Sequence, residues 1–137
     1  MGTERLKYLV DTNIWLEKLL EQAKRLEVDE FFRRIPAAEL ALTDFALFSI
    51  GIALTRGGAH AAFAAFLEEI ITPDDVSVLS IQPDHLRRVV ETATRLGLDF
   101  DDAYQYVAAE NHGLIIVSFD ADFDRTPKGR KSPLAAT

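Results

Sequence analysis

The 137-residue sequence contains no cysteine. This absence excludes disulfide bonds, thiolate zinc sites and cysteine nucleophiles together. No apolar run approaches the roughly 18–20 residues that are needed to cross a membrane, and the N-terminus lacks the basic and then apolar pattern of a signal peptide. We therefore expect a cytoplasmic protein that does not span a membrane.

Basic residues are in the minority, because 15 Lys and Arg stand against 22 Asp and Glu, giving a net charge of −7. This balance argues against a protein that holds nucleic acid with a broad basic face. It leaves open a nuclease that concentrates its acids in a metal site and contacts phosphates locally. With 48% hydrophobic residues the chain can bury a core, so we interpret residues 1–137 as a single domain.

The segment LKYLVDTNIWL, residues 6–16, places a carboxylate between two apolar patterns. Residues 8–10 predict a strand that is buried on both faces, as in parallel sheets. Asp11 stands where this strand ends and a helix begins. Two interpretations stay open: Asp11 caps the helix, or it belongs to a functional site, because ligands bind at the carboxyl ends of strands in open α/β sheets.

The rest of the chain alternates strand patterns with helix patterns. Further strands are expected at 40–42, 76–81 and 114–117, and helices within 14–35, 45–55, 59–71, 86–96 and the segment that Gly113 ends. This alternation is typical of an α/β fold with a parallel sheet and right-handed crossovers.

Three aspartates are predicted to meet at one edge of this sheet. Asp11 follows the first strand, Asp120 follows the last, and Asp102 opens the helix before the last strand. Carboxylates that converge raise one another's pKa values unless a cation is bound. Mg²⁺ or Mn²⁺ would relieve the repulsion, since these ions prefer oxygen ligands.

Some of these residues also have purely structural explanations. Asp102 stands three residues after Asp99, which resembles a capping box at a helix start. Asp122 is expected to face solvent or a neighbouring arginine, with an outer role in the site as the alternative. Trp15 is assigned to the core, with a groove for a partner helix as the alternative. The three histidines are too scattered for a zinc site.

Three motifs, VDTN, DDAYQYVAAENHGL and IIVSFDADF, together resemble the PIN domain, and most closely the small VapC-type toxins of toxin–antitoxin pairs. The resemblance covers residues 8–123. It implies a three-layer α/β/α fold with a short, mostly parallel central sheet, and Mg²⁺- or Mn²⁺-dependent hydrolysis of RNA by metal-activated water. It also implies a homodimer and an antitoxin that covers the site.

The resemblance assigns roles to individual residues. The first, third and fourth acids of the family fall on Asp11, Asp102 and Asp120, which would ligate the metal. Asn13 belongs to the polar pair that follows the first acid, and Ser118 stands where the family often has Thr or Ser. Both would support the site.

One position departs from the family pattern. Ser49 stands where the family usually has a glutamate, so the site loses one anionic ligand and should bind metal more weakly. Asp44 is a possible substitute, but five residues along a helix leave it about 140° away from Ser49, and we interpret it as a helix cap. The departure keeps open a PIN-like module that binds RNA or a protein without cleavage.

A phosphohydrolase with Asp11 as nucleophile is less consistent with the sequence, because Asn13 stands where such enzymes usually need a second aspartate.

The tail, residues 125–137, is locally basic. It could hold RNA phosphates, although its Pro, Gly and Ser content suits a solvated tail, which we favour, or an edge strand. Its basic residues near the site are Arg125, Lys128, Arg130 and Lys131.

Overall fold

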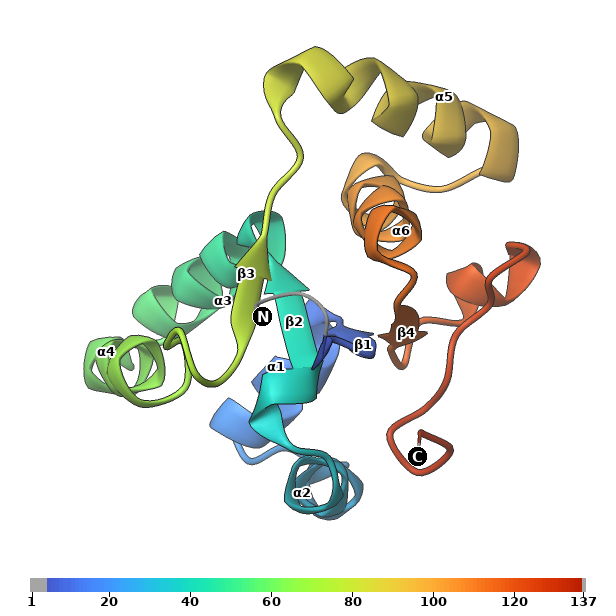
Figure 1. Cartoon of the computed structure of the whole chain (residues 1–137). Coiled ribbons are helices and arrows are strands. Elements are labelled where there is room, and N and C mark those ends of the chain that lie inside the picture. Colours follow the sequence, from blue (N-terminus) through green and yellow to red (C-terminus); the bar gives the residue numbers. More distant parts are fainter. Residues whose placement is uncertain (1–4, 137) are drawn as a thin grey trace.

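A computed structural model describes residues 5–136 and contains a four-stranded sheet (Figure 1). The strands are β1 (Tyr8–Val10), β2 (Leu40–Thr43), β3 (Ser77–Leu79) and β4 (Ile115–Val117). Their order across the sheet is β3-β2-β1-β4, and every pair is parallel. The α/β class is confirmed, with an all-parallel sheet where a mostly parallel one was expected.

Helices cover both faces of the sheet, which confirms the three layers. The helices are α1 (Thr12–Leu19), α2 (Arg25–Arg34), α3 (Asp44–Arg56), α4 (His60–Glu69), α5 (Leu86–Leu96) and α6 (Phe100–His112). Successive side chains of β1 point to opposite faces. Leu9 packs with apolar residues of α5 and α6, whereas Tyr8 and Val10 pack with those of α1 to α4.

Short 3-10 helices complete the chain: η2 (Ala37–Glu39), η3 (Pro83–His85) and η4 (Ala121–Arg125). Gly97 and Gly113 end α5 and α6 with φ angles of 67° and 64°. Glycine adopts this left-handed conformation without a steric penalty, so both predicted helix ends are confirmed.

Helix α6 is buried on more than one side. An unbroken buried run, residues 102–109, extends along it because it lies between the sheet and α5 (Figure 1). The sheet covers one side of this helix and α5 covers another, so the burial is not confined to a single face. The polar side chains of Asp102 and Gln105 on this helix are therefore largely buried.

Trp15 is in the core, as predicted. Its side chain is 1% exposed, and its Nε1 donates a hydrogen bond to the Val10 carbonyl at 3.2 Å. This bond ties α1 to the end of β1. The first turn of α1 is thereby fixed next to Asp11.

The expectation of a solvated tail is wrong for the last part of the described chain. Lys131 forms a parallel bridge with Val117 of β4. The Arg34 guanidinium of α2 donates to the carbonyls of Pro133 and Ala136 at 3.0 and 2.9 Å. The alternative of an edge-strand terminus therefore describes this segment better. No described helix is both long and apolar enough to cross a membrane.

Candidate metal centre

A cavity of about 270 Å³ opens at the carboxyl ends of β1 and β4. Its position follows from the parallel sheet, since Asp11 directly follows β1 and Asp120 lies just beyond β4. The predicted acids Asp11, Asp102 and Asp120 all line it, so the structure brings them together. The remaining lining residues are Thr12, Asn13, Leu16, Phe45, Ala46, Ser49, Asp101 and Gln105.

Asp11 both caps α1 and faces the cavity, so its two interpretations are compatible. Its side chain is 6% exposed, and Oδ1 accepts a hydrogen bond from the Thr12 amide at 2.7 Å. Burial raises the pKa of this carboxyl, and the nearby Asp120 charge raises it further. Hydrogen bonds from Ser118, Gln105 and Thr12 oppose this rise, because they stabilise the charged form.

Ser118 links the polar residues that follow β1 and β4. Its hydroxyl donates to Asp11 Oδ2 at 2.6 Å and accepts from the Asp120 amide at 2.9 Å. The Asn13 amide group donates to the same hydroxyl at 3.4 Å, and its oxygen accepts from the Phe119 amide at 3.3 Å. Both residues thus orient the acids rather than adding charge to the cavity.

Asp102 also has a carboxyl whose pKa is raised. It is only 7% exposed, and burial raises its pKa to about 7. Four neighbouring carboxylates, Asp101, Asp120, Asp11 and Asp122, contribute to the same shift. A group with this pKa is poised to be ionised by a cation near neutral pH.

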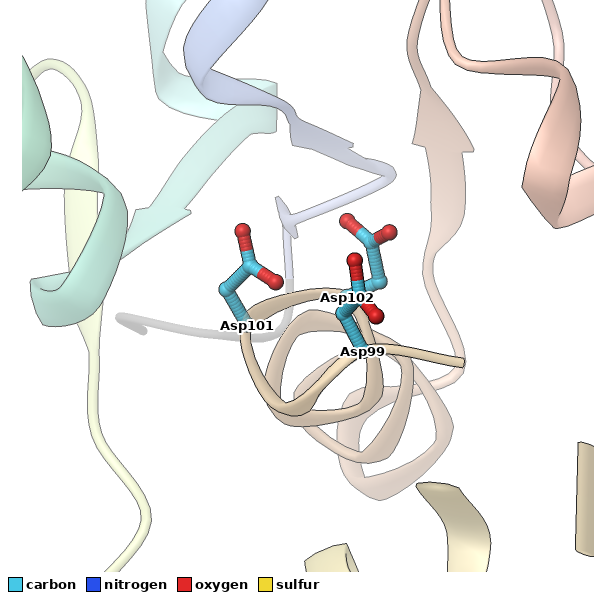
Figure 2. A group of neighbouring side chains, drawn as sticks. All are labelled: Asp99, Asp101 and Asp102. Atoms are coloured by element: carbon cyan, nitrogen blue, oxygen red, sulfur yellow. The ribbon is translucent and has the colours of Figure 1, made fainter. Parts of the chain in front are cut away.

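Carboxylates gather in two close sets around Asp102. In each set, every residue offers an oxygen within 4.8 Å of the others: Asp99, Asp101 and Asp102 form one set, and Asp102, Asp120 and Asp122 form the other. The members of the first set project the same way from the start of α6 (Figure 2). Among the described residues, neither set includes Asp11.

The capping box that was the alternative explanation for Asp99 and Asp102 does not form. Asp99 occupies the N-cap position of α6, but its side chain accepts no capping hydrogen bond. The α6 start is therefore not organised by reciprocal capping. Its acids stand at the positive end of the helix dipole, which favours negative charge there.

Asp122 fits both of its predicted descriptions. It is exposed and lies 3.6 Å from the Arg125 guanidinium. It also belongs to the close set with Asp102 and Asp120. An outer position at the rim of the cavity follows from these two facts.

Ser49 lines the cavity, on the side formed by α3. Asp44 does not line this cavity, so it does not replace the missing acid there. Thr43 is the N-cap residue of α3, and Asp44, at the first helical position, accepts a hydrogen bond from the Phe45 amide at 2.8 Å, so Asp44 also bonds the helix start. The Asp44 carboxylate also accepts hydrogen bonds from the Tyr104 hydroxyl at 2.8 Å and the Ser80 hydroxyl at 3.0 Å. It faces a neighbouring cavity of about 310 Å³.

Gln105 is a residue of this site that the sequence analysis missed. It is 5% exposed and donates from Nε2 to Asp11 Oδ1 at 2.8 Å. The available signal was its spacing, because Gln105 follows Asp102 by three residues and therefore lies on the same side of the helix.

The basic residues of the tail are mostly occupied by contacts within the chain. Arg130 pairs with Asp124 at 3.1 Å and donates to the Ser118 carbonyl at 3.1 Å. Arg125 contacts Asp122 and the Gly97 carbonyl. These guanidinium groups hold the site's own loop in place. Of the basic residues in the tail, the exposed Lys128 and Lys131 are the better candidates for contacting RNA phosphates.

A divalent cation suits the donors around this cavity. Carboxylate oxygens are the ligands that Mg²⁺ and Mn²⁺ prefer. Asp102, Asp120 and Asp122 supply oxygens at close range, and a bound cation would offset the mutual repulsion that raises the pKa of Asp102.

The family profile of the PIN domain matches residues 8–129. The chain belongs to the PIN domain family. The matched range includes β1 to β4 and every acid of the cavity. No curated protein matches the sequence significantly.

Solved structures share the PIN fold. A toxin–antitoxin complex from Klebsiella pneumoniae has a TM-score of 0.73 at 17% identity, covering 93% of this chain and 98% of that one. Mycobacterium tuberculosis VapC20, described as a sarcin-ricin loop cleaving toxin, has a TM-score of 0.73 at 22% identity, covering 86% and 93%. DNA-bound VapBC from Salmonella typhimurium has a TM-score of 0.72 at 17% identity, covering 93% and 97%. At these identities the likeness concerns the fold.

Proposed function

We propose that this PIN domain is a metal-dependent endoribonuclease of the VapC type. The observation that carries the proposal is the convergence of Asp11, Asp102 and Asp120 on one cavity at the carboxyl edge of the sheet. Family membership supports it, and so does the similarity of the fold to a toxin that is described as cleaving the sarcin-ricin loop.

Asp11, Asp102 and Asp120 would hold Mg²⁺ or Mn²⁺, with Asp122 at the rim. When bound, such an ion polarises a phosphate and lowers the pKa of a coordinated water. The residues themselves keep the donors in place: Ser118 fixes Asp11 Oδ2 and the Asp120 backbone, and Asn13 fixes the turn after β4. Ser49 offers the cavity a neutral hydroxyl in place of a charge.

The partners proposed are RNA as substrate, a cognate antitoxin and a second copy of the chain. The proposal of an antitoxin is based on the family resemblance and on the similarity of the fold to chains crystallised as toxin–antitoxin complexes. A homodimer follows from the resemblance alone. Action on RNA would place the protein in the cytoplasm.

A second candidate is a PIN module that binds RNA or a protein without cleaving it. The specific observation in its favour is that Ser49 lines the cavity, while the nearest substitute acid, Asp44, is engaged with Tyr104 and Ser80. In this alternative the cavity is one anionic ligand short for catalysis.

Incubation of a mixed RNA pool with the protein tests the proposal. We expect cleavage with Mg²⁺ or Mn²⁺, none with a chelator, and at least a 100-fold slower reaction in Asp102→Asn. RNA that is bound but left intact at every metal concentration supports the second candidate and contradicts the first.

A further inference from the structure

Gln105 lines the cavity, and one of the two polar groups of its side-chain amide has no hydrogen-bond partner among the described residues. Its Nε2 donates to Asp11, whereas its buried Oε1 has no hydrogen-bond partner among the described residues. Buried amide oxygens are nearly always paired in folded proteins. An unpaired buried oxygen costs stability, so the amide at this position is explained by what its N–H group does for Asp11.

The other polar group of the Gln105 side chain, its Nε2, donates a hydrogen bond to Asp11. Each carboxylate oxygen has two lone pairs. Both lone pairs of Asp11 Oδ1 are used, by the Thr12 amide at 2.7 Å and by Gln105 Nε2 at 2.8 Å. Oδ2 accepts from Ser118 and keeps its second lone pair. Gln105 therefore leaves Oδ2 as the oxygen that Asp11 can offer to a cation.

Gln105 is also rigidly placed. It lies on α6 within the buried run that follows Asp102, and its bond to Asp11 connects segments that are 94 residues apart in the sequence. The amide thus couples the acid of α6 to the acid that ends β1.

We propose that Gln105 is a positioning residue for the divalent cation of this site. Its N–H group occupies Oδ1 of Asp11, so that Oδ2 is the oxygen presented to the ion. The inference rests on the proposed function and deepens it, because it adds a neutral amide to the acids of the cavity.

Cation titration by calorimetry tests the inference. Mn²⁺ is titrated into the wild type and into two variants. Gln105→Met keeps the length of the side chain and removes both of its hydrogen-bonding groups. Gln82→Met is the control, because it makes the same change at an exposed glutamine. We expect the Kd to rise about 10- to 100-fold in Gln105→Met, as for other groups that orient metal ligands, and to stay unchanged in Gln82→Met. An unchanged Kd in Gln105→Met overturns the inference.

A second measurement keeps the test decisive if Gln105→Met does not fold. Mg²⁺ is titrated into the ¹⁵N-labelled wild type, and the side-chain amide signals of Gln105 and Gln82 are followed by NMR. We expect the Gln105 signals to shift at the Mg²⁺ concentration that saturates the site, while those of Gln82 stay constant. Stationary Gln105 signals at saturation overturn the inference but leave the proposed function intact. A wild type that binds neither ion contradicts both.

Discussion

The Ser118 hydroxyl donates a 2.6 Å hydrogen bond to the Asp11 carboxylate across a sequence separation of 107 residues. The same hydroxyl accepts from the Asp120 amide, so one side chain connects the acids that follow β1 and β4. Ser118→Ala should lower the free energy of unfolding by about 1–3 kcal/mol, because it leaves buried polar groups unpaired. Urea denaturation measures this loss, with Ser77→Ala on β3 as the control. Equal stability of both variants would contradict a linking role.

Asp102 should make the metal-free protein less stable as the pH rises. Its pKa is raised from 3.8 to about 7 in the folded state, so between these values the folded state binds more protons than the unfolded state. Stability contributed by the protonated carboxyl is therefore fully present below pH 3.8 and is lost as the pH rises to 7. Asp102→Asn should remove this loss.

Denaturation of the metal-free proteins across pH 4 to 8 provides the measurement. At pH 8 we expect Asp102→Asn to be more stable than the wild type by about 1–3 kcal/mol, relative to their difference at pH 4, after allowance for solvent screening. Asp74→Asn, at an exposed aspartate, should show no such change. Saturating Mg²⁺ should abolish the gain. Parallel pH profiles for wild type and Asp102→Asn would refute the raised pKa.

A substitution at Ser49 should increase metal binding at the site. Ser49 lines the acid cavity, so Ser49→Glu should add a carboxylate there and tighten Mn²⁺ binding by about 10-fold or more. Ser49→Gln has nearly the same size without the charge and should not. Calorimetry and RNA cleavage are followed for both variants. If Ser49→Glu gains neither affinity nor activity, the missing glutamate does not limit this site.

Tyr104 stabilises the fold beside the site without serving the cation. Its hydroxyl donates to Asp44 at 2.8 Å and accepts from the Ile81 amide at 2.9 Å. Tyr104→Phe should cost about 1–3 kcal/mol of unfolding free energy, since it leaves the buried Ile81 amide unpaired. Urea denaturation should detect the loss, and Mn²⁺ titration should give the wild-type Kd. A large change in Kd would place Tyr104 in the metal site after all.

Much of the fold could be predicted because its signals are local. The apolar runs that end in Asp11 and at Val117 mark buried parallel strands, and Gly97 and Gly113 mark helix ends by a backbone requirement. Since parallel strands share their carboxyl edge, the meeting of Asp11, Asp102 and Asp120 at one cavity followed from the order of the elements.

The remaining features depend on contacts between distant segments. The hydrogen bond from Gln105 to Asp11 joins segments that are 94 residues apart in the sequence. Thr43, one residue before Asp44, is the N-cap residue of α3, and Asp44 bonds both the Phe45 amide at the helix start and the Tyr104 hydroxyl across 60 residues, a contact that the local sequence does not indicate. The tail was expected to be solvated because its pairing with β4 leaves no periodic pattern in the sequence.

The most direct test of the central claim is cation titration of the wild type and Asp11→Asn, with RNA cleavage followed in the same samples. Asparagine still caps a helix, so Asp11→Asn removes the charge while keeping the start of α1, and Asp74→Asn serves as the exposed control. We predict that Mg²⁺ and Mn²⁺ binding and RNA cleavage occur in the wild type and in Asp74→Asn and are both lost in Asp11→Asn. A folded wild type that binds neither ion and leaves the RNA intact would contradict the account.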